Sequence, residues 1–482
     1  RNLGITGKNL LTESVGWWDV NMAQSITATN GITEWALMSG VGRVLYNYDE
    51  RYLLTATFRA DGSSRFSKNK WGYFPSVAAA WTVSNEKFMK NVSAVQDLKV
   101  RASYGIVGNQ AIDPYSTLGL MAKLKYNFGT TSDYTGYWAS DIATPDLTWE
   151  KTDKLSVGIE TKTFHDRLTV DFEYYYNKTI DLVNDVTLSQ TSGFSTYKDN
   201  MGQVANKGVE LKLRADIYRD RNWNVALWGN MAHNKNEILK ISDSQKAYNE
   251  RVAAYYKNEA LYQETLGLSH GAEYSVPLPQ YEEGASLTSI WAVRSLGIDP
   301  TTGKEIFLNR DGSIADKWNA AQEVVVGNTE PKCSGAFGLN LSYKNWTLFA
   351  SFLYEWGGQE YNQTLVNNVE NADLVNKNVD LRVLTDRWKK PGDIAQFKDI
   401  KDRGMTTLPT SRFVQDKALV RLNSLNVSYD FNRDWIKKHL RMNLLRLEAS
   451  TSDLINWSSI KQERGLSYPR SWKVEFSLKA QF

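Results

Sequence analysis

The stretch Arg470–Phe482 reads RSWKVEFSLKAQF and has the pattern of a strand with one apolar and one polar face. Its alternate positions from Trp472 to Phe482 are apolar, and the positions between them are polar. Side chains alternate across a strand, so the two sets lie on opposite faces. A transmembrane β-barrel needs strands of about ten such residues, apolar toward lipid and polar toward the lumen. The stretch therefore predicts a barrel strand, although many soluble strands alternate too.

The same alternation recurs along the chain and predicts about fourteen strands. Further segments of this kind span residues 51–59, 98–106, 168–177, 209–217, 346–356 and 424–431. Segment 346–356 carries an aromatic residue at each end of its apolar face, as two interfacial girdles would require.

The connections between these segments fall into two classes. Short turns are predicted at His165-Asp166-Arg167, Arg219-Asp220-Arg221-Asn222 and Lys344-Asn345. Long connections without strand periodicity are predicted at roughly 108–150, 233–287 and 357–415. Short turns at one end and long loops at the other are typical of outer-membrane barrels, and such long loops are uncommon in compact soluble domains.

Composition is compatible with a barrel and argues against a helical membrane protein. Of the 482 residues 42% are apolar, and the mean hydropathy is −0.46. No apolar run exceeds five residues (Val77–Trp81 is one), far short of the roughly eighteen that a spanning helix needs. The 25 Tyr and 17 Trp suit a membrane interface, but they also suit sugar-stacking sites.

Charge and motif content exclude several function classes. A net charge of +3 gives no global electrostatic case for nucleic-acid binding. The single Cys333 rules out an internal disulfide and a cysteine-based zinc site, and four widely spaced His argue against a histidine metal cluster. The acidic, turn-rich stretch from Asp299 to Gly312 lacks the ligand spacing of a calcium loop, so a hairpin turn is predicted there. No catalytic motif, carboxylate pair or cofactor motif is found, so no enzyme and no cofactor are predicted.

Linear motifs spread over nearly the whole chain carry a more specific signal. They are Asp49–Phe66 (DERYLLTATFRADGSSRF), Trp71–Ser76 (WGYFPS), Leu98–Gly105 (LKVRASYG), Asn206–Leu211 (NKGVEL), Gly297–Gly303 (GIDPTTG), Val420–Tyr429 (VRLNSLNVSY) and Tyr468–Trp472 (YPRSW). Each is weak alone, but in number, order and spacing they resemble those of SusC-like (RagA-type) TonB-dependent outer-membrane transporters. The chain departs from the family pattern at Thr451–Trp457, and the segment Ile460–Leu466 is shortened.

The resemblance implies an all-β fold, an antiparallel transmembrane β-barrel of 22 strands with an N-terminal plug. Residues 1–482 would supply about the last fourteen strands, with no counterpart of the plug, the TonB box or the first strands. It also implies the outer membrane of a Gram-negative cell and active uptake of an oligosaccharide or peptide. The implied partners are outer-membrane lipid, a SusD-like lipoprotein that acts as a lid, and the TonB-ExbB-ExbD complex, in a dimer of such pairs.

Candidate site residues are few. Trp472, Phe476 and Phe482 resemble the C-terminal signal that the outer-membrane assembly machinery reads, and the alternative is an edge strand that merely ends there. Substrate-contacting residues stay unknown. Aromatic residues that could stack on a ligand, each with packing as the simpler role, are Trp17, Trp18, Tyr134, Tyr137, Trp138, Tyr361 and Trp388.

Two other classes of protein remain open. The chain could form a passive porin of about fourteen strands, or it could be a soluble β-rich carbohydrate-binding or carbohydrate-degrading protein. The transport hypothesis requires that lipid, and no second protein layer, covers the apolar face of Trp472–Phe482.

Overall fold

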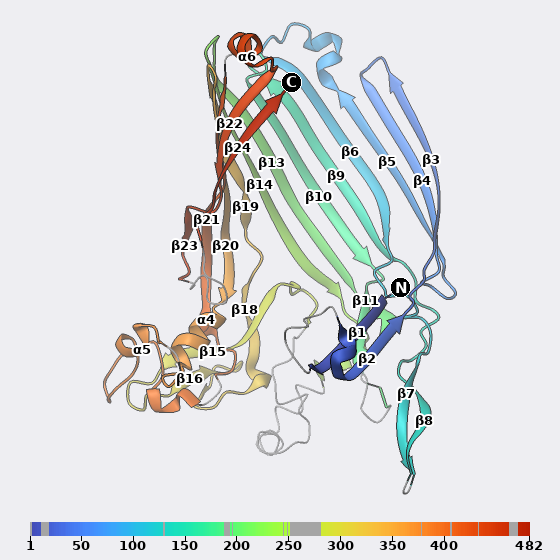
Figure 1. Cartoon of the computed structure of the whole chain (residues 1–482), viewed down its shortest axis with the longest axis vertical. Coiled ribbons are helices and arrows are strands. Elements are labelled where there is room, and N and C mark those ends of the chain that lie inside the picture. The colour runs from blue at the N-terminus through green and yellow to red at the C-terminus, as the bar shows by residue number, and fades with distance from the viewer. Residues whose placement is uncertain are drawn as a thin grey trace.

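One antiparallel sheet of fourteen strands dominates the chain (Figure 1). The computed structural model describes residues 2–10, 19–128, 131–187, 193–194, 196–243, 245–247, 249–250, 281–376, 378–404, 407–431, 433–461 and 471–482. The strands are β3 (Leu37–Tyr48), β4 (Tyr52–Ser63), β5 (Trp71–Thr82), β6 (Val95–Asn109), β9 (Glu150–Thr163), β10 (Leu168–Ile180), β13 (Gln203–Arg219), β14 (Trp223–Lys240), β19 (Cys333–Tyr343), β20 (Trp346–Tyr361), β21 (Val414–Asp430), β22 (Leu444–Thr451), β23 (Asn456–Ser458) and β24 (Val474–Gln481). The predicted strand number is confirmed.

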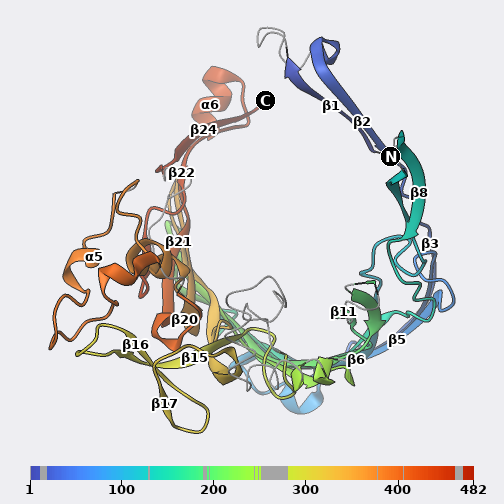
Figure 2. The same cartoon turned by 90° about the horizontal axis from the view of Figure 1, so that it is seen from below.

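Each strand of this sheet pairs with the next one along the chain as far as β21. At the C-terminal edge β22 and β23 both lie along β21, and β24 pairs with β22. The sheet bends into an arc that stays open between β24 and the β1–β2 hairpin (Figure 2). Within the described residues, β3 and β24 each have a neighbouring strand of this sheet on one side only. Among those residues, none of the helices combines the length and the apolar character needed to cross a membrane.

One end of the sheet, here called the turn end, has short connections. The predicted turn Lys344-Asn345 joins β19 to β20, and Lys344 adopts a left-handed φ of 51°. The predicted turns at His165–Arg167 and at residues 219–222 are confirmed as well. The C-terminus lies at this end, together with α6 (Arg433–Leu440) and the turns η3 (Val83–Asn85) and η4 (Lys87–Met89) (Figure 1).

The opposite end, here called the loop end, carries the long connections. The elements there are β1 (Asn2–Leu10), η2 (Val20–Met22), β2 (Ala23–Gly31), β7 (Met121–Phe128), β8 (Thr131–Ala139), β11 (Val183–Thr187), β12 (Thr196–Asn200), β15 (Ser289–Ile298), β16 (Glu305–Leu308), β17 (Ile314–Ala315), η6 (Ala320–Gln322), β18 (Glu323–Asn328), α4 (Gln363–Leu365), η7 (Val366–Glu370), α5 (Arg382–Thr385), η8 (Ile400–Gly404) and η9 (Ser411–Phe413). Within the connection predicted at 108–150 the structure has the strands β7 and β8, although the sequence there shows no strand periodicity. Strand β14 also continues to Lys240, past the loop start predicted at 233, because backbone pairing with β13 continues where the side chains no longer alternate.

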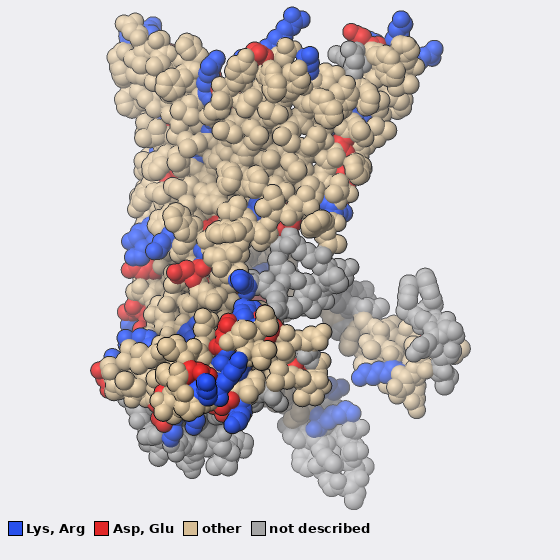
Figure 3. All heavy atoms as spheres, turned by 90° about the vertical axis from the view of Figure 1, so that its left-hand side faces the viewer, with Lys and Arg blue, Asp and Glu red and all other residues tan. Residues whose placement is uncertain are grey.

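The two faces of the sheet differ in polarity. Directly paired residues share a face, and one face carries unbroken apolar rows such as Val100, Ile159, Phe172 and Leu211. The other face is polar and includes Glu150, whose Oε1 accepts from the backbone N of Val183 in β11 at 2.9 Å. Because β11 lies inside the arc, this polar face is the concave one (Figure 2). The apolar face is therefore the outer one. On the side shown in Figure 3 it forms an uncharged band between charged margins.

The outer apolar residues have no protein cover in the described part of the chain. Trp472, Phe476 and Phe482 are 78%, 76% and 78% exposed. Phe337 and Leu213, far from that edge, are 44% and 42% exposed. The condition set by the sequence, that no second layer covers the Trp472–Phe482 face, is met for the residues described. Lipid is the solvent that suits such a surface.

Candidate functional site

An ion network lies on the polar inner wall at mid-height. The guanidinium of Arg101 on β6 binds Glu160 of β9, and its Nη2 lies 2.9 Å from Asp171 and 2.6 Å from Glu173 on β10. Lys212 of β13 adds a second cation, 3.6 Å from Asp171. Four strands are thus linked across the inner face, as their register requires. Charges of both signs pair here, so the wall is hydrophilic without a large field of one sign.

Hydrogen-bonding groups extend this wall toward the loop end. The hydroxyl of Tyr175 donates to Asn234 at 2.9 Å, and the Nδ2 of Asn234 donates to Asn206 at 3.2 Å. Ser156 donates to Glu173 at 2.6 Å. These side chains line a shallow inner recess of about 940 Å³ that crosses β4 to β14. The recess offers alternating donors and acceptors to a polar solute.

An aromatic cluster closes the inner wall near the loop end. Phe66 is 0% exposed and packs on Trp149, with ring centroids 5.3 Å apart, and Phe74 packs on the same ring at 5.5 Å. The indole N–H of Trp149 donates to the carbonyl of Lys70 at 3.0 Å. This cluster fixes the β4–β5 connection against the start of β9. Packing rather than ligand stacking is its visible role.

The loop end also holds a folded unit, here called the cap, made of β15–β18 and residues 362–413. Its apolar core includes Val366, Val369 and Phe413, which are 2%, 0% and 0% exposed. Arg412 ties the two parts of the cap together through Glu305, at 3.0 Å, and Glu370, at 2.6 Å. Burial lowers the pKa of Arg412, but its bonds to Glu370 and Glu305 outweigh burial and raise it. The cap is thus built around a buried ion triad.

A second buried carboxyl in the cap lacks such a partner. Glu323 of β18 is 1% exposed, and its Oε1 has no hydrogen-bond partner among the described residues. Burial raises the pKa of Glu323 to about 7, and nearby Arg310 only partly opposes this shift. This places the titration of Glu323 near neutral pH.

The aromatic residues considered as ligand-stacking candidates separate into two groups. Trp388 is 8% exposed and donates to the carbonyl of Pro300 at 2.8 Å, while Tyr361 packs on Phe413, so both have packing roles in the cap. Tyr137 and Trp138 of β8 are 65% and 45% exposed on the projecting β7–β8 hairpin (Figure 1). Trp17, Trp18 and the side chain of Tyr134 lie outside the described residues.

The stretch from Asp299 to Gly312 forms turns, as predicted. Asp299 follows β15, and its carboxylate accepts from the backbone N of Thr301 at 2.9 Å and from the hydroxyl of Thr302 at 2.6 Å. These bonds lower the pKa of Asp299. Asp311 caps the next turn through Ser313 at 2.9 Å. Both carboxylates are occupied by their own turns.

Comparison with known proteins decides the family. The family model described as TonB dependent receptor-like, beta-barrel, matches residues 11–444. The chain belongs to the TonB-dependent receptor family. It is SusC-like (RagA-type), as its motifs predicted, and it is an all-β transmembrane barrel protein of the outer membrane, with the long loops on the extracellular side and the short turns on the periplasmic side.

The chain spans less than half the length of the relatives that it matches. TonB-dependent receptor P3 of Formosa agariphila is 31% identical over 90% of the chain and 42% of the relative. SusC of Bacteroides thetaiotaomicron is 34% identical over 49% of the chain and 24% of the relative. The structure described as the RagAB peptide transporter is 25% identical with a TM-score of 0.75, over 91% of this chain and 46% of that one.

Sequence reasoning missed the Arg101 network and the Arg412 triad. The first had a readable signal, because Arg101, Asp171 and Glu173 all fall on the polar side of their alternating segments. The second had none, since Arg412 and Glu305 are 107 residues apart in non-periodic sequence.

Proposed function

We propose that residues 1–482 are the C-terminal barrel part of an importer that takes up an oligosaccharide or peptide across the outer membrane with energy from the TonB complex. The observation that carries this proposal is the sheet's polarity: an exposed apolar outer face and a polar inner wall, on a chain of this family. Antiparallel strands satisfy their backbone groups in lipid, and the inner wall gives a polar path. The chain would act by binding and passage, without making or breaking covalent bonds.

The partners belong to the same proposal. The names SusC and RagAB of similar proteins support a SusD-like lipoprotein as a lid over the loop end. A plug and the first strands, in a region N-terminal to these residues, would complete a 22-strand barrel and reach the TonB-ExbB-ExbD complex. Two such pairs would form a dimer. The similar RagAB structure is described as a peptide transporter. That description does not decide whether this chain takes up a peptide or a glycan.

Uptake in cells tests the proposal directly. Cells that carry the full-length gene are given fluorescent oligosaccharides and peptides, with and without a functional TonB complex. We expect uptake of one class, and its loss when TonB is absent. Uptake that persists without TonB, or a steady open-channel conductance of the purified protein in a planar bilayer, would favour the passive porin instead.

Two simpler measurements address the remaining alternatives. Membranes are extracted with and without detergent, and the purified protein is then weighed intact and examined for bound lipoproteins. We expect extraction only with detergent, a mass near twice the 54.8 kDa of these residues, and a co-purifying lipoprotein.

The C-terminal strand carries a separate proposal, that Trp472, Phe476 and Phe482 form an assembly signal. All three are exposed at the free edge of the sheet, where a receptor for unfolded barrels could reach them. We expect Phe482→Ala to reduce the folded protein in the outer membrane severalfold, with the neighbouring substitution Gln481→Ala as the control. Equal membrane levels for both variants would show that β24 is only an edge strand.

A further inference from the structure

Three connections at the turn end lie side by side and form one surface, here called the basic rim. They are residues 219–222 between β13 and β14, residues 344–345 between β19 and β20, and residues 431–443 between β21 and β22, with α6. The backbone N of Lys344 donates to the carbonyl of Asn222 at 2.8 Å, and the backbone N of Asp430 donates to the carbonyl of Asn345 at 2.9 Å. The three connections therefore share one stretch of the periplasmic margin.

Basic residues outnumber acidic residues in the basic rim. The sequence places two carboxylates there, Asp220 and Asp434, against seven basic residues, Arg219, Arg221, Lys344, Arg433, Lys437, Lys438 and Arg441. The three other connections of the turn end, residues 49–51, 83–94 and 164–167, hold four basic and four acidic residues. In Figure 3 Lys and Arg prevail over Asp and Glu along the upper margin, which is the turn end. The charge excess thus belongs to one sector of this end.

The acidic residues beside these cations do not neutralise them. Lys437, Lys438 and Arg441 are exposed and form no ion pair within the described part of the chain. The carboxylate of Asp220 accepts from two backbone N–H groups of its own turn, each at 2.7 Å. Because exposed cations that lie close together repel each other, the basic rim favours an anionic partner.

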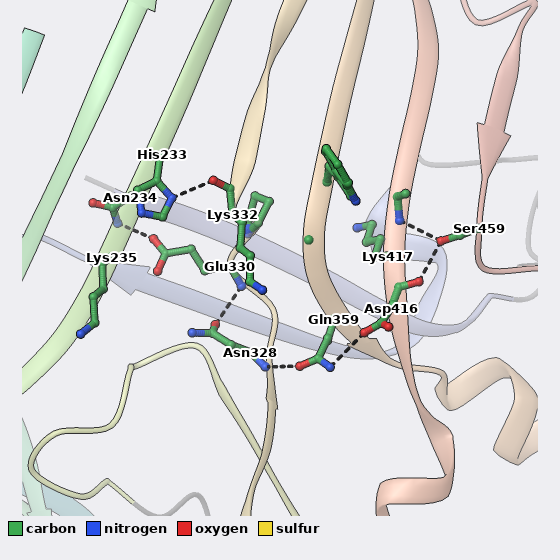
Figure 4. Close-up of a pocket in the computed structure, with 14 residues that line it drawn as sticks. His233, Asn234, Lys235, Asn328, Glu330, Lys332, Gln359, Asp416, Lys417 and Ser459 are labelled. Atoms are coloured by element: carbon green, nitrogen blue, oxygen red, sulfur yellow. Dashed lines mark hydrogen bonds between the residues drawn. The ribbon is translucent and has the colours of Figure 1, made fainter.

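The opposite margin of the same strands carries its counter-charges within the chain. In a recess of about 540 Å³ at the loop end, Lys417 lies 3.5 Å from Glu355 and 3.3 Å from Glu360. Asp416 lines the same recess and accepts from Gln359 at 3.0 Å (Figure 4). Lys417 is therefore paired, unlike the cations of α6, and the charge excess is a feature of the turn end.

An aromatic row on the outer face adjoins the basic rim. Direct strand partners form it, in the order Trp223, Tyr343, Trp346 and Tyr429. The ring centroids of Trp223 and Tyr343 are 4.2 Å apart, and those of Trp346 and Tyr429 are 4.8 Å apart. The amine of Lys344 lies 5.3 Å from the centre of the Tyr343 ring. Because Trp and Tyr of a membrane protein lie at the headgroup level, this row places the neighbouring cations beside the phosphates of the leaflet.

The helix α6 adds a membrane-surface element to the same sector. In Figure 2 it lies on the outer side of β22 and β24, away from the centre of the arc. Ile436 is 1% exposed, whereas Trp435 is 51% exposed and its ring stacks on His439 with centroids 5.2 Å apart. Lys437 and Lys438 are exposed on the same helix. A helix that exposes an aromatic ring together with lysines suits the surface of an anionic leaflet.

We propose that the basic rim binds anionic phospholipids of the periplasmic leaflet, with their phosphates among the cations of α6 and the two turns and their acyl chains along the aromatic row. Lys and Arg donate charge-assisted hydrogen bonds to phosphate oxygens, and clusters of basic residues next to a spanning segment attract anionic lipid. A zwitterionic phospholipid has the same phosphate, but its ammonium group opposes these cations. The site holds one sector of the wall in the periplasmic leaflet, and it does not depend on what the barrel transports.

Lipid binding to the purified full-length protein in detergent tests this proposal. The probes are dioleoyl phosphatidylglycerol, dioleoyl phosphatidylethanolamine and sn-glycerol 3-phosphate, and binding is followed by native mass spectrometry over a titration of each. We expect phosphatidylglycerol to bind more tightly than phosphatidylethanolamine, and the double substitution Lys437→Gln/Lys438→Gln to weaken it roughly thirtyfold. The double substitution Lys87→Gln/Lys90→Gln, at exposed lysines in the charge-balanced part of the turn end, is the matched control and should leave binding unchanged.

Two further variants separate charge and lipid contact from folding. Lys437→Arg/Lys438→Arg keeps the positive charge and is expected to bind phosphatidylglycerol as the wild type does, which a folding defect at α6 would not allow. We expect Trp346→Ala to weaken phosphatidylglycerol severalfold but not sn-glycerol 3-phosphate, because only the lipid has acyl chains that reach the aromatic row.

Other outcomes would overturn the proposal. They are equal binding of the two lipids, an unchanged affinity of the Lys437→Gln/Lys438→Gln variant, and an equal loss in the Lys87→Gln/Lys90→Gln control. Displacement of the lipid by sn-glycerol 3-phosphate at matched concentration would assign the basic rim to a soluble phosphate instead. Uptake by the Lys437→Gln/Lys438→Gln variant is expected to stay near normal, so failure here leaves the transport proposal intact.

Discussion

In the spanning wall, Phe337 and Leu213 are 44% and 42% exposed, whereas in the cap Val369 and Phe413 are 0% exposed. The two regions belong to one chain and use the same kinds of apolar residue in opposite ways. The wall presents them outward and keeps its polar groups inside. The cap buries them around an ion triad, as a water-soluble domain does. The solvent on each side, lipid for the wall and water for the cap, decides which face of an element is apolar.

The largest effect is expected from opening the buried triad of the cap. Arg412→Met leaves Glu370 and Glu305 as buried charges without a partner, which costs about 3–5 kcal/mol. We expect residues 362–413 to become protease-sensitive while the wall keeps its β-sheet circular dichroism in detergent. Arg412→Lys, which retains the charge but loses the forked geometry, should have a smaller effect. Simultaneous loss of the wall would mean that the cap and the wall are a single cooperative unit.

A charged substitution on the outer face tests whether lipid covers the wall. Leu213→Arg places a cation in the apolar band of β13 and should lower the free energy of unfolding by about 2–4 kcal/mol if the site lies near the bilayer centre. Its neighbour Lys212 faces the inner wall, so Lys212→Arg is the matched control and should be close to neutral. Unfolding by urea in lipid vesicles measures both variants. Equal stability of the two would contradict the assignment of the outer face to lipid.

These two regions also differ in how far the sequence could predict them. The wall was predictable because its period-two pattern is local: Leu348 and Phe352 of β20 lie on the predicted apolar face, and their partners Val427 and Leu422 extend it. The cap was not predictable, because its core joins Val366, Val369 and Phe413 from non-periodic segments. For Trp388 the sequence favoured packing over ligand stacking without naming its contacts, and only the tertiary structure shows that it is buried.

The boundaries of the strands failed for a related physical reason. From His233 to Lys240 the residues of β14 are mostly polar and lose the alternation, while their backbone pairing with β13 continues and Ile238 packs inside the protein. Hydrogen bonding between strands does not require an apolar face, whereas the alternation in the sequence shows only which residues share a face.

For the same reason the sequence predicted that the inner wall is polar, but it did not predict which charged residues of the wall pair with each other.

The pH dependence of the cap should follow Glu323. Because burial raises its pKa from 4.5 to about 7, the folded cap keeps this proton at pH values where the unfolded chain has lost it. The contribution of the protonated Glu323 to stability is complete below the unfolded pKa and is lost as pH rises through about 7. Over this range the free energy of unfolding of the cap falls by up to about 3 kcal/mol. We expect Glu323→Gln to remove this dependence and to make the cap more stable than the wild type at pH 8. Hydrogen exchange of β15 and β18 at pH 5 and pH 8 measures the stability of the cap in the wild type and in Glu323→Gln. An equal change in stability between the two pH values in both proteins would exclude Glu323 as the source of the pH dependence.

The smallest effect is expected from replacing one Trp by Phe, first in the cap and then, in a separate variant, in the wall. Trp388→Phe in the cap removes the hydrogen bond that the buried indole donates to the carbonyl of Pro300, which still accepts from the backbone N of Gly392, and this costs about 1 kcal/mol. Trp346→Phe at the turn end of the wall changes a ring that is 52% exposed and lies 4.8 Å from the ring of Tyr429. Its indole N–H has no protein acceptor to lose if it faces headgroups and water, so the cost should stay below about 0.5 kcal/mol. Thermal unfolding in lipid vesicles compares the two variants. A larger loss for Trp346→Phe would mean that the wall depends on protein packing at this girdle more than on its surrounding lipid.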